Sequence, residues 1–307
     1  MLQKFRYYIL MHLVIFMWGF TGILGKLIHI DAPYLVWHRI LISFISLLIG
    51  LYFLKMPMRI HNRKAMLKVF GTGIIVALHW ITFYTSIKLS TASLGILCLS
   101  TTTLHVTWIE PLVFKKRFSW VEFLFGLLVV FGIYFVSSDF DETQYLALGL
   151  GLVSALCAAF FSVFNAKLAE EVPSSSITLH EMGIGLVFLS VVLLFTGKMN
   201  GNLFQMTAGD LGWLLFLGIC CTSFAFIATI EVMKKLGAFT VSLSINLEPV
   251  YTIILAIPIL HEDELLNGNF YAGSAMIILV VIANAIYKSK MRERELKKNE
   301  SLIDSAL

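Results

Sequence analysis

An acidic residue followed by a proline lies in the middle of a long apolar segment, which runs from Gly237 to Leu260. Glu248 is about 11 residues from either end, so a helix rising about 1.5 Å per residue would place its carboxyl group roughly 17 Å deep. That depth is near the middle of a hydrocarbon layer about 30 Å thick. An ionisable group there costs several kcal/mol unless it faces a partner or water, which indicates a functional site. Pro249 breaks the helix and frees backbone carbonyl groups beside it, as expected at the midplane site of a transporter.

Two roles are open for Glu248. As a coupling residue, it would bind a proton or a substrate amine. As a structural residue, it would be a neutral acid that hydrogen-bonds to a neighbouring helix. Burial favours the uncharged form of a carboxyl group, so both roles agree with a proton carrier. Asn246 joins the same face if Pro249 unwinds the turn, and would then supply a hydrogen bond to the substrate.

Arg39 is a second charged side chain inside an apolar segment. It lies roughly 9 Å deep by helical rise. Its long stem could carry the guanidinium group to the membrane interface. Alternatively, Arg39 pairs with a carboxylate or binds an anionic group of the substrate, for which the planar guanidinium fork suits two-point contact. Both interpretations fit the sequence.

Aromatic and polar side chains recur on the faces of other apolar segments. Trp18 and Thr21 share a helix face with two glycines, a pattern typical of close helix packing or of a cavity wall. Trp80 and Tyr84 share a face at a depth where tryptophan is unusual, since membrane tryptophans collect at the interfaces. They would line a cavity or pack in the core. The candidate substrate-binding residues are Trp18, Thr21, Arg39, Trp80, Tyr84, Thr101, His105, Asn165 and Asn246.

The composition excludes a large soluble domain. Of 307 residues, 58% are hydrophobic and 14% are charged, whereas soluble domains carry about 25% charged residues. The four cysteines all lie in apolar segments without C-x-x-C spacing, so no disulfide framework, redox motif or metal site is expected. No cofactor is expected either. The net charge of +4 comes mostly from one side of the membrane and does not indicate nucleic-acid binding.

The hydropathy pattern predicts an all-α integral membrane protein with ten transmembrane helices. Their expected positions are 9–28, 33–54, 67–87, 90–114, 119–138, 146–168, 175–196, 209–230, 237–260 and 268–287. Of the 23 Lys and Arg residues, 19 fall on one side of this arrangement and two on the other. By the positive-inside rule, both termini are cytoplasmic, in a plasma membrane that we take to be a bacterial inner membrane. The acidic loop at 261–264, on the other side, is expected to be solvated.

The two halves of the chain resemble each other weakly. WGFTGILGKL (Trp18–Leu27) can be laid on AFFSVFNAKL (Ala159–Leu168), and Gly126 on Gly273. Five spans in each half would place the second half upside down in the membrane, the inverted-repeat architecture of many secondary transporters. The expected domains are 1–138 and 139–288, followed by a charged cytoplasmic tail at 289–307. On this alignment Glu248 matches Thr101, so the central acid is not duplicated.

These residues resemble a known family, the EamA branch of the drug/metabolite transporter superfamily. The matching pieces are Trp18–Thr21 early in the first span, Asn246–Tyr251 in the ninth, and Glu262 and Glu264 ahead of Gly273. The resemblance covers about residues 8–288. It implies ten helices, a central cavity and movement of small metabolites, often the export of amino acids or related compounds.

The first half departs from the usual family pattern at two positions. Thr102 stands where a proline is common in the fourth helix, and Arg117 stands where a glutamate is common. Strict symmetry of the two halves is therefore not expected.

The function expected is a secondary active transporter that exports a small-molecule substrate across the lipid bilayer by alternating access, with possible proton coupling through Glu248. A passive channel or facilitator is the alternative. A membrane-embedded enzyme would need clustered catalytic groups, and the sequence has no H-E-x-x-H, G-x-S-x-G or G-x-x-x-x-G-K-[ST] motif. The lack of a nucleotide motif also argues against a primary pump within this chain.

Overall fold

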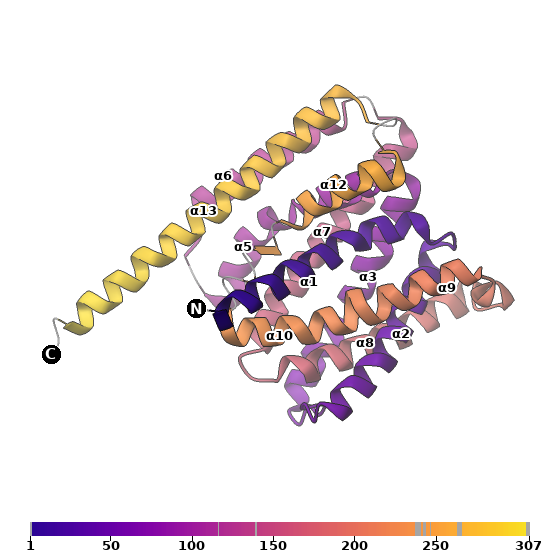
Figure 1. Ribbon diagram of the computed structural model, residues 1–307, viewed down its shortest axis with the longest axis horizontal. Coiled ribbons are helices and arrows are strands. Elements are labelled where there is room, and N and C mark those ends of the chain that lie inside the picture. Colours follow the sequence, from indigo (N-terminus) through magenta and orange to yellow (C-terminus); the bar gives the residue numbers. More distant parts are fainter. Residues whose placement is uncertain are drawn as a thin grey trace.

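The computed structural model is a bundle of helices (Figure 1). It describes residues 2–115, 117–138, 140–236, 241, 244–245, 247–262 and 266–304. In chain order the helices are α1 (Leu2–Leu27), α2 (Ala32–Phe53), α3 (Arg63–Leu89), α4 (Ala92–Leu99), α5 (Thr102–Phe114), α6 (Trp120–Val136), α7 (Glu142–Leu168), α8 (Ser174–Phe195), the 3-10 helix η1 (Gly201–Phe204), α9 (Ala208–Leu215), the π-helix η2 (Phe216–Phe224), α10 (Ala225–Leu236), α12 (Glu248–Leu260) and α13 (Gly268–Asp304). No strand occurs in these ranges, which confirms the predicted all-α class.

The ten-span arrangement is confirmed. Eight helical segments in the described ranges are long and apolar enough to cross a membrane, and α6 and α12 are shorter apolar helices. Both chain ends lie at the same end of the bundle, as an even number of crossings requires (Figure 1). Helices begin where the sequence supplies caps. Asn62 accepts the backbone N–H of Lys64 at 2.9 Å, and Asp141 and Gln144 cap each other's backbone at the start of α7.

Three segments differ from the continuous spans predicted. The span at 90–114 divides into α4 and α5 around Ser100 and Thr101, where threonine hydroxyls donate to carbonyl groups three residues earlier. Such bonds compete with regular helix and bend it. The span at 209–230 contains the nine-residue π-helix η2. The tail that begins at Ser289 is not a separate segment, because α13 continues through it to Asp304.

Helix contacts follow an internal two-fold relation between the halves. In the first relation, α1 packs along α12, and their counterparts α7 and α5 pack along each other in the same way. In the second, α3 packs against α8, and their counterparts η2 and α2 pack against each other. α6 and α13 pack on each other at one edge of the bundle (Figure 1). There a Cβ on Gly132 would meet Ile277 at 2.5 Å, and one on Gly273 would meet Val136 at 2.7 Å. The two glycines therefore let α6 and α13 approach each other closely.

The predicted match of Gly126 to Gly273 stays a prediction. Gly126 has a different neighbour, because a Cβ placed on it would lie 2.6 Å from Leu104 Cδ1. It lets α5 approach α6 within the first half, whereas Gly132 and Gly273 lie between the halves.

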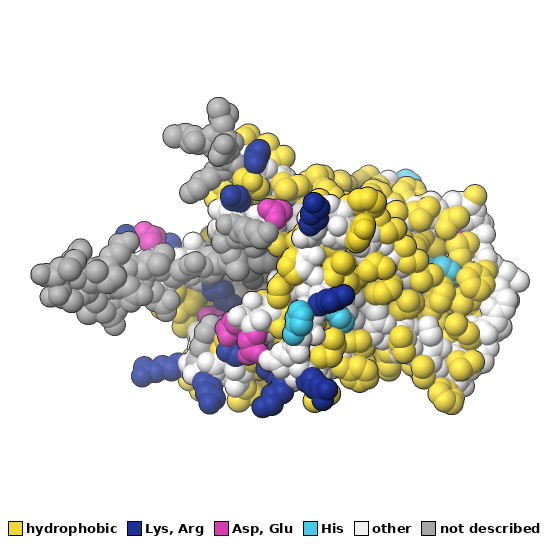
Figure 2. All heavy atoms as spheres, turned by 90° about the horizontal axis from the view of Figure 1, so that it is seen from below, with side chains coloured by type: hydrophobic (Ala, Val, Ile, Leu, Met, Phe, Trp, Pro, Cys, Tyr) yellow, Lys and Arg dark blue, Asp and Glu magenta, His cyan; other side chains and the backbone are white. Residues whose placement is uncertain are grey.

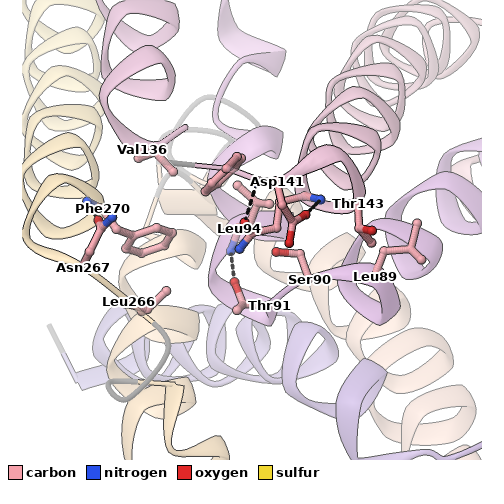
Figure 3. A pocket seen from close by; sticks show the side chains of 12 residues that line it. Leu89, Ser90, Thr91, Leu94, Val136, Asp141, Thr143, Leu266, Asn267 and Phe270 are labelled. Carbon is pink, nitrogen blue, oxygen red and sulfur yellow. Dashed lines mark hydrogen bonds between the residues drawn. The ribbon is translucent and has the colours of Figure 1, made fainter. Parts of the chain in front are cut away.

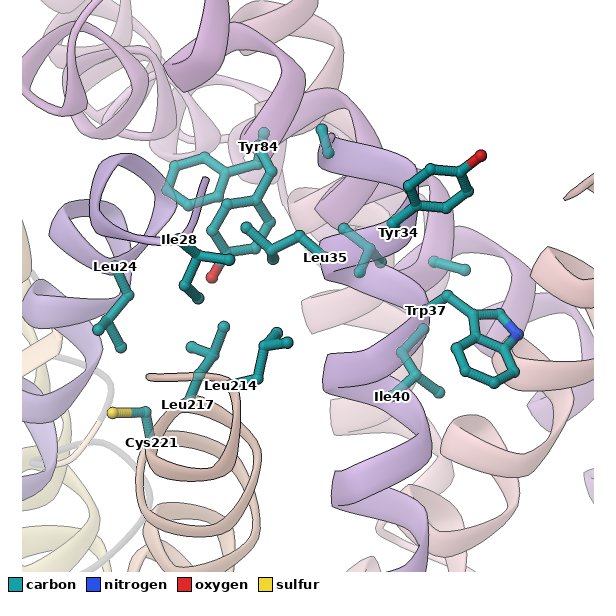
Figure 4. Packing of buried hydrophobic residues seen from close by; sticks show 14 of the residues in the cluster. Leu24, Ile28, Tyr34, Leu35, Trp37, Ile40, Tyr84, Leu214, Leu217 and Cys221 are labelled. Carbon is teal, nitrogen blue, oxygen red and sulfur yellow. The ribbon is translucent and has the colours of Figure 1, made fainter. Parts of the chain in front are cut away.

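Charge divides the surface into two ends. Lys and Arg side chains gather at the end that holds the chain termini, and hydrophobic side chains cover much of the rest of the face in Figure 2. We call this the basic end, and the end formed by the α1–α2, α3–α4, α6–α7, α8–α9 and α12–α13 connections the far end. Between them, the largest cluster of buried apolar side chains packs α1, α2, α3, α8 and η2 together (Figure 4). Tyr84 lies within it, near Ile28 and Leu35.

Candidate substrate-binding site

Arg39 lies inside the bundle and does not reach the membrane interface. It is 5% exposed. Its Nη1 donates to the hydroxyl of Tyr84 at 2.8 Å, and its Nε donates to Oγ1 of Thr222 at 3.2 Å. Its guanidinium carbon lies 3.9 Å from the centre of the Trp80 ring, a cation–π contact. Three side chains from α3 and η2 thus hold Arg39 in place, and the interpretation that it extends to the interface is excluded.

The aromatic residues of α3 form one wall of this cluster. Tyr84 is fully buried, and its hydroxyl donates to the carbonyl of Thr21 on α1 at 3.4 Å. The predicted close packing of the α1 glycines is present as well, since a Cβ on Gly25 would lie 3.0 Å from Tyr84 Cδ1. Trp80 is partly exposed, with one ring face against the guanidinium group. The structure therefore brings together Arg39, Trp80 and Tyr84 with the backbone carbonyl of Thr21, whose own hydroxyl donates to the carbonyl of Trp18 at 2.6 Å. Their role in substrate binding stays a prediction.

Thr222 joins the cluster although nothing in the sequence singled it out. It lies on the π-helix η2, where its Oγ1 donates to the carbonyl of Leu217 at 2.9 Å and accepts from Arg39. A donor and acceptor five residues apart are characteristic of π-helical geometry, which is frequent at functional sites. The neighbouring Ser223 donates to the carbonyl of Gly218, also five residues earlier, and bonds Ser46 of α2 at 2.6 Å.

Glu248 is the first residue of α12, where the predicted interruption of the ninth span occurs. Leu247 forms a turn before it, and Pro249 lies in the first helical turn, where its missing N–H has no helical partner to lose. Glu248 is partly buried and interacts electrostatically with Arg39. No carboxylate of the described residues lies within 4.0 Å of Arg39, so Glu248 and Arg39 do not form an ion pair in direct contact.

The backbone at Glu248 is held against α1. Thr252 donates its hydroxyl to the carbonyl of Gly19 at 2.8 Å and to that of Glu248 at 3.1 Å. A Cβ on Gly19 would lie 3.3 Å from the carbonyl oxygen of Glu248, and one on Gly22 would lie 3.2 Å from Thr252 Cγ2. The glycines of α1 therefore let the start of α12 approach the same helix that carries Thr21.

The remaining predicted site residues lie elsewhere. Trp18 packs beside α10 and lines a small hollow nearer the basic end. Thr101 is buried and donates to the carbonyl of Cys98 at 2.7 Å. His105 packs edge-on against a tryptophan of its own helix, and Asn165 lies on α7 beside a buried acid of α8. No contact joins these four to Arg39 in the described ranges, and Asn246 lies outside them.

The far end is tied across the two halves by a buried carboxylate. Glu262, which was expected in a solvated loop, is 2% exposed. Its two oxygens accept the backbone N–H groups of Ala92 at 2.6 Å and Ser93 at 3.1 Å, the first turn of α4. A carboxylate is stabilised there because the unpaired N–H groups and the helix dipole both favour negative charge. The expectation of a solvated Glu262 is wrong, since local sequence does not reveal a helix start 170 residues away.

Further bonds at the far end involve α1 and α9. Lys26 donates to the carbonyl of Ser90, so its amine is used in the protein. The backbone N–H of His29 donates to Asp210 at 2.7 Å, and Asp210 also forms a reciprocal cap with Thr207 at the start of α9. The bond from His29 to Asp210 links the loop after α1 in the first half to the start of α9 in the second.

A hollow of about 430 Å³ lies at the far end, between α4, α6, α7 and α13. Figure 3 shows Asp141, Thr143 and Asn267 around it. Thr91 also lines the hollow, and its Oγ1 accepts the backbone N–H of Leu94 at 3.0 Å. Its lining includes none of the residues around Arg39. It is a surface depression between connections and is separate from the candidate site.

The geometry at Arg39 suits recognition of a small charged solute. Two of the five guanidinium N–H donors are used by Tyr84 and Thr222, and the described residues supply no partner for the others. A carboxylate could take two of them in the bidentate arrangement that guanidinium favours. Glu248 of α12, which interacts electrostatically with Arg39, offers the opposite charge. Such a site can bind and orient a solute, and it contains no nucleophile paired with a base.

Fold and site together define a membrane transporter built from two five-span halves around a polar centre. A solved crystal structure aligns with 93% of this chain and 99% of its own, at a TM-score of 0.64 and 14% identity, which establishes the fold. The model of the EamA-like transporter family matches residues 5–138 and 145–286. The chain belongs to this family, and it is a transporter rather than an enzyme.

Two curated relatives are named as transporters. An uncharacterized transporter of Clostridium kluyveri is 25% identical over 177 residues, 57% of this chain and 55% of the relative. The uncharacterized transporter YyaM of Bacillus subtilis is 28% identical over 127 residues, 41% of this chain and 40% of the relative. The matched segments span about half the length of these relatives or less.

Proposed function

We propose that this protein is a secondary active transporter that exports small zwitterionic metabolites, amino acids or related compounds, across a bacterial inner membrane by alternating access. The observation that carries the proposal is Arg39, fixed in the bundle by Tyr84, Thr222 and Trp80 with guanidinium donors unused. A buried cation whose remaining donors have no partner among the described residues supports binding of an anionic group.

Glu248 gives the site its second charge. A zwitterion placed between the two helices would set its carboxylate on Arg39 and its amine toward Glu248. In the empty site, Glu248 would take a proton instead. Competition between proton and amine for one carboxyl group couples the two fluxes in opposite directions, because both cannot occupy it at once. Both termini are cytoplasmic in this proposal, which follows from the gathering of Lys and Arg at the basic end.

Matched solutes test the proposal on purified protein. One amino acid, its amide without the carboxylate, and its deaminated acid without the amine are compared by thermal shift. A ligand that binds the folded state raises its apparent stability by mass action, about 2.7 kcal/mol at 100 times Kd. We expect the amino acid to give the largest shift in unfolding temperature and the amide to give none. We also expect Arg39→Gln to abolish the shifts caused by the amino acid and by the deaminated acid, which both carry a carboxylate. An amide as effective as the amino acid would contradict the role of Arg39.

Flux measurements distinguish coupled transport from the facilitator alternative. In proteoliposomes, uptake of the binding solute is measured with and without an imposed proton gradient. We expect the gradient to drive accumulation above equilibrium. A flux that equilibrates the solute equally in both conditions would establish a passive facilitator and contradict coupling, while leaving the assignment of Arg39 intact.

A further inference from the structure

Glu181 on α8 is a buried acid that the site around Arg39 does not use. Its side chain is fully buried, and neither carboxyl oxygen has a hydrogen-bond partner in the described ranges. Its polar neighbours are Thr72 of α3 and Asn165 of α7, which lie close without completing a hydrogen bond. Asn165 Oδ1 is likewise buried without a partner.

The position of Glu181 in the second half is that of Arg39 in the first. α2 and α8 are both 22 residues long, and Ala32 and Ser174 at their starts are 142 residues apart. Arg39 and Glu181 are also 142 residues apart, so each is the eighth residue of its helix, roughly 10 Å from the helix start. Because the helices belong to inverted halves, Glu181 lies toward the basic end and Arg39 toward the far end.

Reciprocal glycine contacts support this equivalence independently of helix bounds. A Cβ on Gly218 of η2 would lie 2.6 Å from Ile42 Cγ2 and 3.4 Å from the carbonyl oxygen of Arg39. A Cβ on Gly73 of α3 would lie 2.9 Å from Ile184 Cγ2 and 3.1 Å from the carbonyl oxygen of Glu181. One packing motif therefore carries a cation in the first half and an acid in the second.

The charged groups on the helices around Glu181 are occupied by other partners. On α3, Lys68 pairs with Glu171 at 4.0 Å, and on α7, Lys167 pairs with Glu170 at 2.5 Å. His180, the preceding residue, has its Nδ1 2.8 Å from the carbonyl of Ser176. On α2, the packed stretch 40–53 carries no ionisable group except Tyr52, which is 67% exposed. The sequence of α10 has three ionisable residues, Glu231, Lys234 and Lys235.

No cation of the described residues therefore lies within 4.0 Å of Glu181. An isolated buried carboxylate costs several kcal/mol, so such a group is held as the neutral acid. The neutral acid has an O–H to donate, and Asn165 Oδ1 is a buried acceptor without a donor. One proton would satisfy both groups. After the proton leaves, the Asn165 amide can turn and offer its N–H to the carboxylate.

We propose that Glu181, with Asn165 and Thr72, forms a proton-binding site near the basic end, the counterpart of the anion-binding position at Arg39. It takes up a proton when the basic end is closed around it and releases the proton when water enters between α3, α7 and α8. The proposal rests on the proposed function in that the proton has a role in transport, but proton binding itself is measured without any substrate.

Infrared difference spectra of the full-length protein in nanodiscs, recorded in pH steps, test the site directly. We expect protonated-carboxyl absorption that titrates in wild type. One component of it should be lost in Glu181→Gln and persist in Glu171→Gln, a matched change at the same end, while the component of Glu248 remains in both variants. Asn165→Leu keeps the acid but removes its acceptor, and should shift the band and its midpoint. In proteoliposomes, Glu181→Gln should make the transport rate nearly independent of internal pH, so that the rates measured at two internal pH values have a ratio close to one.

The outcomes separate this proposal from the function of Arg39. If Glu181→Gln leaves the carboxyl spectrum unchanged, or Asn165→Leu leaves band and midpoint unchanged, the proton site is wrong, whatever the solutes do. If the band behaves as expected but amino acid and amide give equal thermal shifts, the proton site stands and the proposed substrate class is wrong. A Glu181→Gln protein that fails to fold leaves Asn165→Leu as the deciding variant.

Discussion

The third span of the first half and its counterpart in the second show how the two repeats diverge. α3 is a regular helix of 27 residues, whereas its counterpart runs through α9, η2 and α10. Their starts, Arg63 and Ala208, are 145 residues apart, but their ends, Leu89 and Leu236, are 147 apart. The second half therefore holds two extra residues, and a π-helix accommodates them because each of its turns contains more residues than an α-turn.

The extra residues lie where the second half meets Arg39. η2 packs against α2 and presents Thr222 to the guanidinium group, whereas the equivalent face of α3 meets Glu181 without completing a hydrogen bond. The two halves thus share a backbone arrangement and differ in chemistry at matching places. In the proposed function, the polar groups that bind solute and proton lie where the two halves differ, whereas the glycine contacts are shared by both halves.

The start of α12 is the strongest asymmetry and gives the largest expected effect. α5 and α12 both have 13 residues and both end in a left-handed residue, Lys115 and His261. This register matches Glu248 to Thr102, one residue from the match predicted by sequence, and confirms that the first half has no acid there. We expect Glu248→Gln to abolish pH-dependent transport, a loss of roughly tenfold or more, equivalent to above about 1.4 kcal/mol. Proteoliposome flux measures this, with expression level as the control for folding.

A reciprocal change tests whether the asymmetry itself matters. Thr102 donates to the carbonyl of Ala155 on α7 at 3.3 Å, whereas Glu248 interacts with Arg39. An acid at position 102 would face α7 rather than the guanidinium group. Adding Thr102→Glu to Glu248→Gln should therefore leave transport inactive. Recovery of pH-dependent flux in the double variant would contradict the assignment of coupling to one half.

The symmetric glycines provide the next largest effect, on stability. Alanine at Gly218 would place a Cβ 2.6 Å from Ile42, and alanine at Gly73 would place one 2.9 Å from Ile184. Overpacking of this kind costs about 1–3 kcal/mol, and we expect both variants to unfold at lower temperature. Gly212→Ala and Gly71→Ala, on the same two spans with nothing within 4 Å, are matched controls. They should be neutral or stabilising, by up to about 1 kcal/mol, because alanine favours helix. Unchanged stability in Gly218→Ala and Gly73→Ala would contradict the close packing of Gly218 on Ile42 and of Gly73 on Ile184 that the two halves share.

Much of the fold follows from hydropathy, because a membrane span needs a length and composition that single residues reveal. The number of spans and the interruption before Pro249 were predictable on those grounds. The break between α4 and α5 and the π-helix were not, since both depend on local hydrogen bonds and on packing against α2 and α7. The continuous helix from Gly268 to Asp304 was also missed, because a change from apolar to charged residues does not interrupt helical backbone.

The candidate site was predictable in part for a similar reason. Depth follows from position in a span, so Trp80 and Tyr84 could be placed away from the interface and Arg39 roughly 9 Å deep. The rotation of a helix about its axis is set by the neighbouring helices. The sequence therefore left open whether the Arg39 side chain extends to the membrane interface or points into the bundle. Thr222 carries no signal beyond a polar side chain in an apolar segment, and its role depends on η2.

The smallest effect should come from Thr222, which distinguishes the two versions of the third span. Thr222→Val keeps the shape of the side chain but removes the acceptor for Arg39 Nε. A net hydrogen bond contributes about 0.5–1.5 kcal/mol, so substrate affinity should fall roughly 2- to 13-fold. Thr222→Ser retains the hydroxyl and should bind as wild type does. Calorimetric titration with the amino acid identified above measures both. Equal affinity in Thr222→Val and wild type would mean that Tyr84 and Trp80 suffice to hold Arg39, and that the π-helix serves packing rather than the site.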